Sequence, residues 1–218
     1  MAAFVAAAAL AAAGFFLVPW MILSAPLEPV MGFVQKIFYF HVPCAIMLFL
    51  STFVCAAGSI AYLFKGSERG DRLALAAGEL GVLFGTCVLV TGPLWGRKAW
   101  GVWWQWDARL TSTLVMWMIF NAYLLLRRYG GPGSDRLAAA VALFGMANVP
   151  FVYWSVNVWR TLHPKTSVIP SLQPGMRGPF WFCVVAFLLL FSLLLSLRME
   201  LEKRRQQLDE LYLAAEGD

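Results

Sequence analysis

Residues 95–109 read WGRKAWGVWWQWDAR, and this stretch holds five of the chain's ten tryptophans. It separates two apolar runs, residues 73–94 and 110–126, that approach or exceed the length a helix needs to cross a bilayer. The tryptophan segment, as residues 95–109 are called below, is therefore expected to join two membrane helices at one surface of the membrane. There its rings could anchor the protein or form a flat aromatic platform.

The whole chain has the composition of a membrane protein. Of its 218 residues, 61% are hydrophobic and only 13% are charged, which is too apolar for a soluble domain. Because helices satisfy every backbone group within lipid, we predict an all-α fold, a single membrane domain over residues 1–218 with six transmembrane helices. The predicted spans are 3–23, 40–64, 73–94, 110–126, 137–159 and 178–197, followed by a tail over 198–218.

Unequal numbers of basic residues on the two sides set the predicted orientation. One set of loops, with the tail, holds ten: Lys65, Arg69, Arg72, Arg127, Arg128, Arg136, Arg198, Lys203, Arg204 and Arg205. The other set holds seven: Lys36, Arg97, Lys98, Arg109, Arg160, Lys165 and Arg177. Cytoplasmic loops carry the excess of Lys and Arg, so both termini are predicted to be cytoplasmic. The outer set contains only two acids, and its positive charge suits an anionic ligand or partner, or lipid phosphates.

Two features of the predicted cytoplasmic side stand out. Glu79 lies within the third run, where snorkelling or contact with Arg72 would make a buried charge tolerable. The tail over 198–218 alternates charged residues with leucines, so it is expected to continue the sixth span as an amphipathic helix. Such a helix could dock a cytoplasmic subunit or remain solvated.

The chain has only two histidines, His41 and His163, and the topology places both at the outer ends of spans. Pro43 suits the first turn of a helix, which puts His41 at the start of the second span. Pro164 biases His163 away from helical geometry, so His163 belongs to the loop after the fifth span. One imidazole is predicted on a helix end and the other on a loop.

Two neutral imidazoles beside flat rings and cations match the requirements of haem. Imidazole nitrogens supply axial ligands to iron, aromatic rings stack on the macrocycle, and Arg or Lys neutralises propionates. Each histidine alone could instead simply bond a loop carbonyl, and Asp107 suits an N-cap for the helix after it. The four cysteines form no CxxC pair, and no metal site without haem is supported.

The residues around the histidines and tryptophans resemble a known family. The pattern Trp95-Gly96-x3-Trp100-Gly101-x2-Trp104-x-Trp106-Asp107-x-Arg109 resembles the motif of the tryptophan-rich WWD family of haem-handling proteins in cytochrome c maturation. His41 before Val42-Pro43, and His163 after Thr161-Leu162, resemble the two histidines that flank this motif. Larger members of the family carry a second histidine pair, which this chain lacks, so the resemblance is strongest to the haem exporter protein C (CcmC) branch.

This resemblance implies a role and a set of partners. Members of the branch present haem, non-covalently and transiently bound haem b, at the outer face of the bacterial inner membrane for loading onto the haem chaperone CcmE. They act with the ATP-binding cassette proteins CcmA and CcmB and the small membrane protein CcmD, so lipid and protein partners are expected and nucleic acid is not. The implied site is His41 and His163 as axial ligands, with Trp100, Trp103, Trp104, Trp106, Asp107 and Arg109 around haem and chaperone.

Two other functional classes fit the sequence less well. A b-type electron-transfer subunit is the alternative, but such proteins bury their histidine ligands within spans on facing helices. A transporter that conducts haem through its core would need polar or broken helices near the midplane. No set of nucleophile, base and orienting acid is visible, so the chain is not predicted to be an enzyme.

Overall fold

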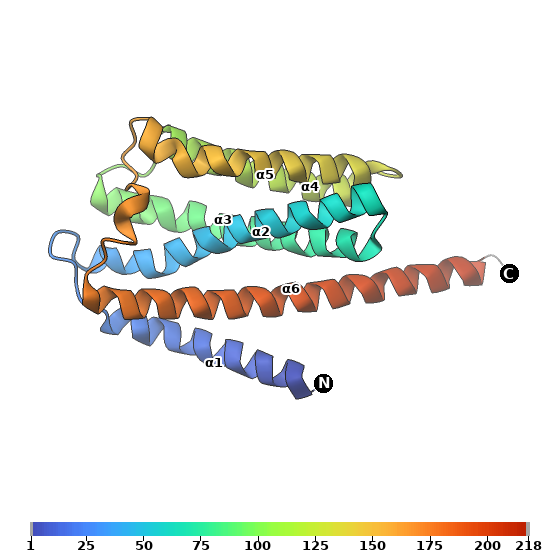
Figure 1. Cartoon of the computed structure of the whole chain (residues 1–218), viewed down its shortest axis with the longest axis horizontal. Helices are drawn as coiled ribbons and strands as arrows, with labels where there is room; N and C mark the ends of the chain where they lie inside the picture. The colour runs from blue at the N-terminus through green and yellow to red at the C-terminus, as the bar shows by residue number, and fades with distance from the viewer. Residues whose placement is uncertain (1, 217–218) are drawn as a thin grey trace.

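The computed structural model describes residues 2–216, which form six long helices and two short 3-10 helices (Figure 1). Their order is α1 (Ala2–Ser24), η1 (Phe33–Ile37), α2 (Phe38–Lys65), α3 (Glu68–Ala99), α4 (Ala108–Tyr129), α5 (Ser134–Val158), η2 (Thr166–Val168) and α6 (Pro174–Glu216). All six long helices are long and apolar enough to cross a membrane. The prediction of an all-α, six-span membrane protein is therefore confirmed.

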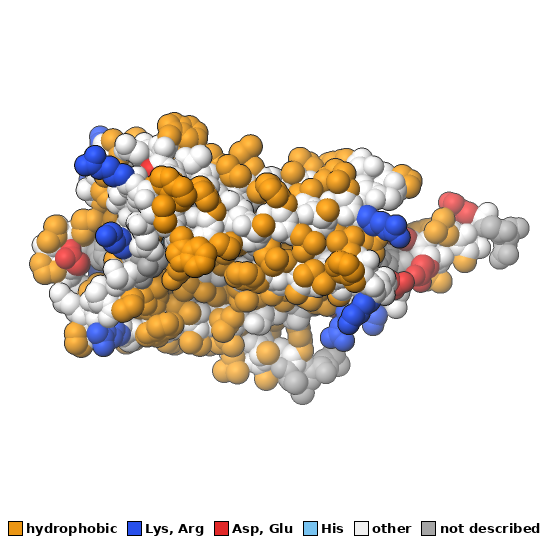
Figure 2. Space-filling model, turned by 45° about the horizontal axis from the view of Figure 1, so that its top comes forward, with side chains coloured by type: hydrophobic (Ala, Val, Ile, Leu, Met, Phe, Trp, Pro, Cys, Tyr) orange, Lys and Arg blue, Asp and Glu red, His pale blue; other side chains and the backbone are white. Residues whose placement is uncertain are grey.

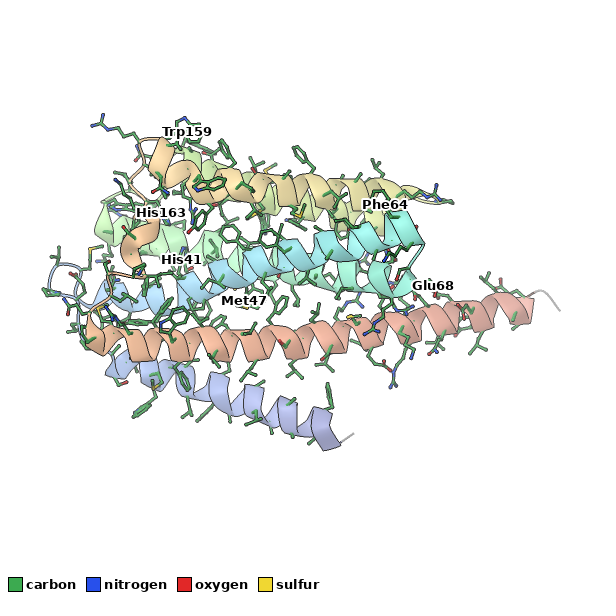
Figure 3. All side chains as sticks on the ribbon, in the orientation of Figure 1. His41, Met47, Phe64, Glu68, Trp159 and His163 are labelled. Carbon is green, nitrogen blue, oxygen red and sulfur yellow. The ribbon has the colours of Figure 1, made fainter. Side chains whose placement is uncertain are left out.

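The helices run roughly side by side along the long axis of the molecule (Figure 1). α2 packs against α3, and α4 packs against α5, while α1 packs mainly on α6. The two ends of the chain lie at one end of the bundle, and His41 and His163 lie at the other (Figures 1 and 3). This second end is called the histidine end below.

Hydrophobic side chains cover the middle of the molecule, and charged ones gather toward its ends (Figure 2). This distribution suits a bilayer, whose core accepts apolar side chains and leaves charges at the interfaces. Cys44, Cys55 and Cys183 are buried and Cys87 is half-buried, and all four are free thiols. Free cysteines placed in this way pack as small hydrophobic side chains.

Glycine allows the first hairpin of the bundle to close tightly. A Cβ at Gly58 in α2 would lie only 2.5 Å from the carbonyl oxygen of Gly70 in α3, so no larger residue fits there without moving a backbone. Gly66 ends α2 with φ 61°, a left-handed conformation that glycine adopts at little cost. Only Gly66 and Ser67 therefore separate α2 from α3.

Helix boundaries at the histidine end differ from those predicted. α2 begins at Phe38, directly after η1, so Pro43 lies inside α2 rather than in its first turn. α3 continues past the predicted end of its span through Trp95 to Ala99. The apolar run stops at residue 94, but the helix continues, and its last turns contact the loop that follows: Arg97 donates to the Gly101 carbonyl, and the Trp95 ring meets that of Trp100 edge-on.

The opposite end of the bundle is joined by ion pairs. Arg127 of α4 forms two bonds to the carboxylate of Asp71 in α3, 2.5 and 2.7 Å long, and a further pair with Asp135 at 3.1 Å. Glu79 pairs with Arg198 of α6, so the predicted contact with Arg72 is wrong. α6 continues as a helix to Glu216, which confirms the helical tail.

A buried lysine ties α1 to the histidine end. The Lys36 ammonium donates to the carbonyls of Ile22 at 2.8 Å and Leu23 at 3.3 Å, and also to that of Ala25. These are carbonyls at the C-terminal end of α1, which have no partner within the helix. The positive charge satisfies them and suits the negative end of the helix dipole.

Candidate functional site

The tryptophan segment is part helix and part loop. Its first five residues complete α3, and residues 100–107 form an irregular connection to α4. Gly101 turns this loop with φ 80°, in the left-handed region. Asp107 ends it by accepting the backbone N–H of Leu110 at 2.8 Å, so the predicted N-cap of the next helix is confirmed.

The histidine end encloses a cavity of about 620 Å³, a size typical of sites for small molecules and cofactors. Its walls come from η1 and the loop before it, from α2, α3, α4, α5 and the start of α6, and from the loop that contains η2. Five of the residues predicted from the sequence line it together: His41, His163, Trp100, Trp104 and Arg109. Figure 3 shows the two histidines near each other at this end of the bundle.

The other three predicted residues do not line the cavity. Trp103 and Trp106 point outward, with 58% and 76% of their surface exposed. Asp107 is engaged in the cap of α4 and in a bond with Thr161. The segment therefore divides into rings that face the cavity and rings that face outward.

His41 is held with one ring nitrogen free. Its Nδ1 lies 2.8 Å from the hydroxyl oxygen of Thr91 in α3. The Thr91 hydroxyl donates its single proton to the carbonyl of Cys87 at 2.6 Å, so it accepts from His41. With the proton on Nδ1, the lone pair of Nε2 is available to a metal.

His163 is held in the same tautomer by its own loop. Its Nδ1 lies 2.8 Å from the carbonyl oxygen of Pro164. A carbonyl only accepts, so Nδ1 carries the proton and Nε2 is again free. Burial and the nearby Arg109 guanidinium lower the pKa of His163 from 6.5 to about 4, which keeps the ring neutral at physiological pH.

Donors for an anionic group surround the same cavity. Arg109 and Lys165 both line it, and Arg109 also donates to the carbonyl of Val152 at 2.5 Å. The indole N–H groups of Trp95 and Trp104 are buried, and within residues 2–216 neither has a hydrogen-bond partner. Because an unpaired buried donor is costly, these two groups suit the acceptor oxygens of a ligand.

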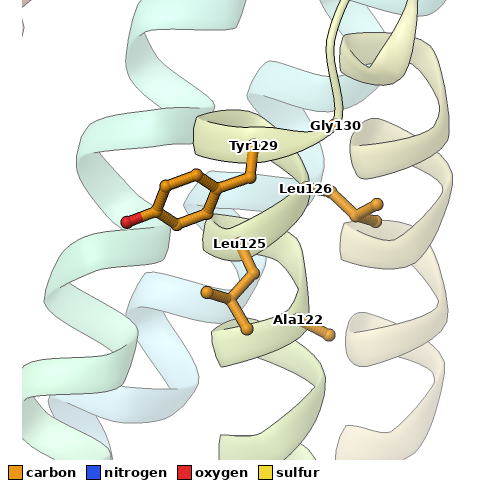
Figure 4. A pocket seen from close by; sticks show the side chains of 5 residues that line it. All are labelled: Ala122, Leu125, Leu126, Tyr129 and Gly130. Atoms are coloured by element: carbon orange, nitrogen blue, oxygen red, sulfur yellow. The ribbon is translucent and has the colours of Figure 1, made fainter.

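A separate hollow at the C-terminal end of α4 contains neither a histidine nor a cation. It measures about 370 Å³ and is formed by apolar side chains, with Tyr129 at its edge (Figure 4). The residues around it are Ala122, Leu125, Leu126, Tyr129 and Gly130. None of them is a histidine, a cysteine or a charged residue.

A comparison of the whole chain with known protein families shows which family it belongs to. The family model described as heme exporter protein C matches residues 1–213. The chain belongs to the heme exporter protein C family. This confirms the resemblance seen in the tryptophan segment and the two histidines.

Three relatives illustrate the range of the heme exporter protein C family. The chain is 36% identical over 210 residues to heme exporter protein C of Escherichia coli, covering 89% of this chain and 82% of that protein. It is 38% identical over 192 residues to heme exporter protein C of Bradyrhizobium diazoefficiens, covering 83% and 72%. A putative cytochrome c biosynthesis ccmC-like mitochondrial protein of Marchantia polymorpha is 32% identical over 184 residues, covering 83% and 78%.

Several residues of the site were missed in the sequence. Trp95 begins the tryptophan segment and its motif but was not predicted as a site residue. Lys165 was counted only as a loop charge, although its position two residues after His163 was a usable signal. Thr161 was noted only as a neighbour in the motif around His163, with no role of its own. Thr91 gave no signal, because a single threonine in a span is common.

Proposed function

We propose that this chain holds non-covalent haem b transiently between His41 and His163, at the periplasmic face of a bacterial inner membrane, and delivers it to the haem chaperone CcmE. Membership of the heme exporter protein C family makes the chain a multi-pass membrane protein of haem handling for cytochrome c maturation, not a classical enzyme. Haem is therefore its cargo. The iron ligands, the side of the membrane and the chaperone are the proposal.

One observation carries the choice of ligands. His41 and His163 line the same cavity, and each gives its Nδ1 proton to a neighbouring oxygen, which leaves Nε2 free. Bonds of this kind to the remote nitrogen orient imidazole ligands and raise their basicity in metal sites. Haem would bring iron to both nitrogens, and iron with two imidazoles as axial ligands is a common arrangement.

The remaining walls fit the other parts of haem. Arg109 and Lys165, with the indole N–H groups of Trp95 and Trp104, can bind its two propionates through charge-assisted hydrogen bonds. Trp100 contributes a ring at the cavity wall, where apolar contact with the macrocycle is favourable. Apolar residues of α2 line the deeper part of the cavity and exclude water from it.

The outward rings suit the receiving partner. Trp103 and Trp106 are large, apolar and exposed, which is the character of anchors in protein interfaces. Their position in the same segment as Trp100 and Trp104 would bring a docked chaperone beside the cavity. His163 is the ligand better suited to leave during transfer, because a loop holds it, whereas His41 is fixed on α2 and bonded to α3.

The wider assembly follows the same reasoning. The family name implies an exporter with further components, and we propose CcmA, CcmB and CcmD for this role. The excess of basic residues in the loops at the opposite end supports a cytoplasmic position for both termini, and thus a periplasmic position for the cavity. The end of α6 would then extend into the cytoplasm, where it is accessible to soluble subunits.

The test compares haem content and transfer in purified variants. The wild-type protein should contain low-spin haem, His41→Ala and His163→Ala should each lose that spectrum, and added CcmE should take up the haem from the wild type. Trp103→Ala with Trp106→Ala should keep the spectrum and slow the transfer. Trp20→Ala, an equally exposed tryptophan on α1, is the matched control and should change neither.

Three outcomes would contradict parts of the proposal. An unchanged haem spectrum in both histidine variants would remove the axial ligands. Haem that cycles between redox states without passing to the chaperone would instead favour an electron-transfer subunit. Faster transfer from His41→Ala than from His163→Ala would reverse the order in which the ligands leave.

A further inference from the structure

Asp107, the last residue of the tryptophan motif before α4, connects two structural elements at once. One carboxylate oxygen, Oδ1, accepts the backbone N–H of Leu110 at 2.8 Å and caps α4. The other, Oδ2, accepts the hydroxyl proton of Thr161, which is 54 residues away in the loop after α5. The carboxylate therefore fixes this loop to the start of α4.

Thr161 passes this connection on to His163. Its hydroxyl has a single proton, which it gives to Asp107, so its oxygen is free to accept. It accepts the backbone N–H of His163 at 3.1 Å, a local turn that threonine commonly forms with the residue two positions ahead. The ring of His163 is then oriented by its Nδ1 bond to Pro164.

We infer that Asp107 is a positioning residue for His163, acting through Thr161 and not by contact with haem. The inference rests on the proposed function, in which His163 is an iron ligand. Asp107 does not line the cavity, and both of its oxygens already accept hydrogen bonds. A motif residue next to the outward Trp106 thus serves the ligand on the loop, and ties that loop to the segment that would meet the chaperone.

The chain of bonds also explains how a loop can present a ligand with a fixed direction. His163 lies between α5 and η2, where no regular hydrogen-bond ladder holds the backbone. The Asp107 carboxylate is itself fixed by the cap of α4, and a bond from a hydroxyl to a charged acceptor is stronger than one to a neutral acceptor. Without Thr161, His163 would keep only the bond to its own neighbour.

The test removes the link without removing the ligand or the cap. Thr161→Val has the same shape but neither donates nor accepts, and it leaves the Asp107 bond to Leu110 in place. Outer partners of metal ligands typically alter affinity by about 10- to 100-fold, so Thr161→Val should weaken haem binding by about that factor. It should also lower the low-spin fraction in absorption and resonance Raman spectra, and Thr161→Ser should restore both.

The matched control is Thr111→Val, in the first turn of α4. The Thr111 hydroxyl is buried and has no hydrogen-bond partner within residues 2–216, so its removal should leave the spectrum and the affinity unchanged. If Thr161→Val does not elute as a folded protein, Asp107→Asn carries the test. Asparagine also caps helices well, but it places an amide NH2 group, which cannot accept, where Oδ2 of Asp107 accepts from Thr161. The charge-assisted bond is then lost, so the low-spin fraction should fall.

The possible results separate this inference from the proposed function. If His163→Ala changes the spectrum but Thr161→Val, or Asp107→Asn in its place, matches the wild type, the positioning role is refuted and the ligand stands. If His163→Ala itself leaves the spectrum unchanged, His163 is not a ligand and both ideas fail. A loss in Thr161→Val that Thr161→Ser does not restore would point to packing and overturn the role of the hydroxyl.

Discussion

Replacing Thr91 by valine should weaken haem binding through the tautomer of His41. The Thr91 hydroxyl bridges the Cys87 carbonyl and the His41 ring, over 2.6 and 2.8 Å. Valine has the same shape but no acceptor. The Nδ1 proton then lacks a partner, or it moves to Nε2 and blocks the nitrogen that would bind iron.

The expected magnitude follows from the cost of one unmade hydrogen bond. Leaving a partly buried donor unpaired costs about 1–2 kcal/mol, which corresponds to a factor of about 5 to 30 in an equilibrium constant. Thr91→Val should therefore raise the dissociation constant for haem by this factor. Thr91→Ser keeps the hydroxyl and should remain close to the wild type.

The assay is haem titration of the purified haem-free protein, followed by absorption. Thr86→Val is the matched control, because Thr86 lies on the same helix and also donates to the carbonyl four residues before it, at 2.8 Å. Its hydroxyl accepts from Trp117 at 3.0 Å and not from a histidine. Thr86→Val should bind haem as the wild type does. An unchanged dissociation constant in Thr91→Val would refute the tautomer argument.

Three further changes test other parts of the account. A Cβ at Gly92 would lie 3.3 Å from Cε1 of His41, so Gly92→Ala should displace the ring and lower haem affinity about fivefold. Gly178 has open space around it, so Gly178→Ala should bind haem normally in the same titration. The pKa of His163 is lowered to about 4 in the folded protein, so as pH falls the unfolded state binds a proton on this ring before the folded state does. The haem-free protein should therefore lose stability as pH falls from about 6.5 to about 4. In thermal denaturation, His163→Gln should lack the loss of stability that this ring causes, and parallel pH profiles of the two proteins would contradict the argument. Arg198→Met leaves Glu79 without its ion-pair partner. It should lower the free energy of unfolding by about 1–2 kcal/mol, a value between those of exposed and buried ion pairs. A double-mutant cycle with Glu79→Gln should show coupling between the two residues, and additive effects would exclude a stabilising ion pair.

Much of the fold could be predicted because apolar length alone specifies helices in a bilayer. Each predicted span lies within one helix or overlaps it almost fully, and the cap at Asp107 follows from residue type and position. Local chemistry also placed His163 on a loop. What local chemistry could not provide was a partner far away in the chain, such as Arg198 for Glu79, which is 119 residues distant.

The site was harder to predict than the fold. Trp103 and Trp104 are neighbours in sequence, yet one is exposed and the other lines the cavity. They lie in an irregular loop, where no helical or strand period relates sequence position to side-chain direction. The hydroxyls of Thr91 and Thr161 act only once α2 meets α3 and the loop after α5 meets α4, so their roles come from packing.

The most direct measurement is a cryo-electron microscopy structure of the haem-loaded protein. The account predicts haem in the cavity at the histidine end, with iron bound by Nε2 of His41 and Nε2 of His163, and with its propionates beside Arg109 and Lys165. Haem bound on the outward surface of Trp103 and Trp106, or iron bound by neither histidine, would contradict it.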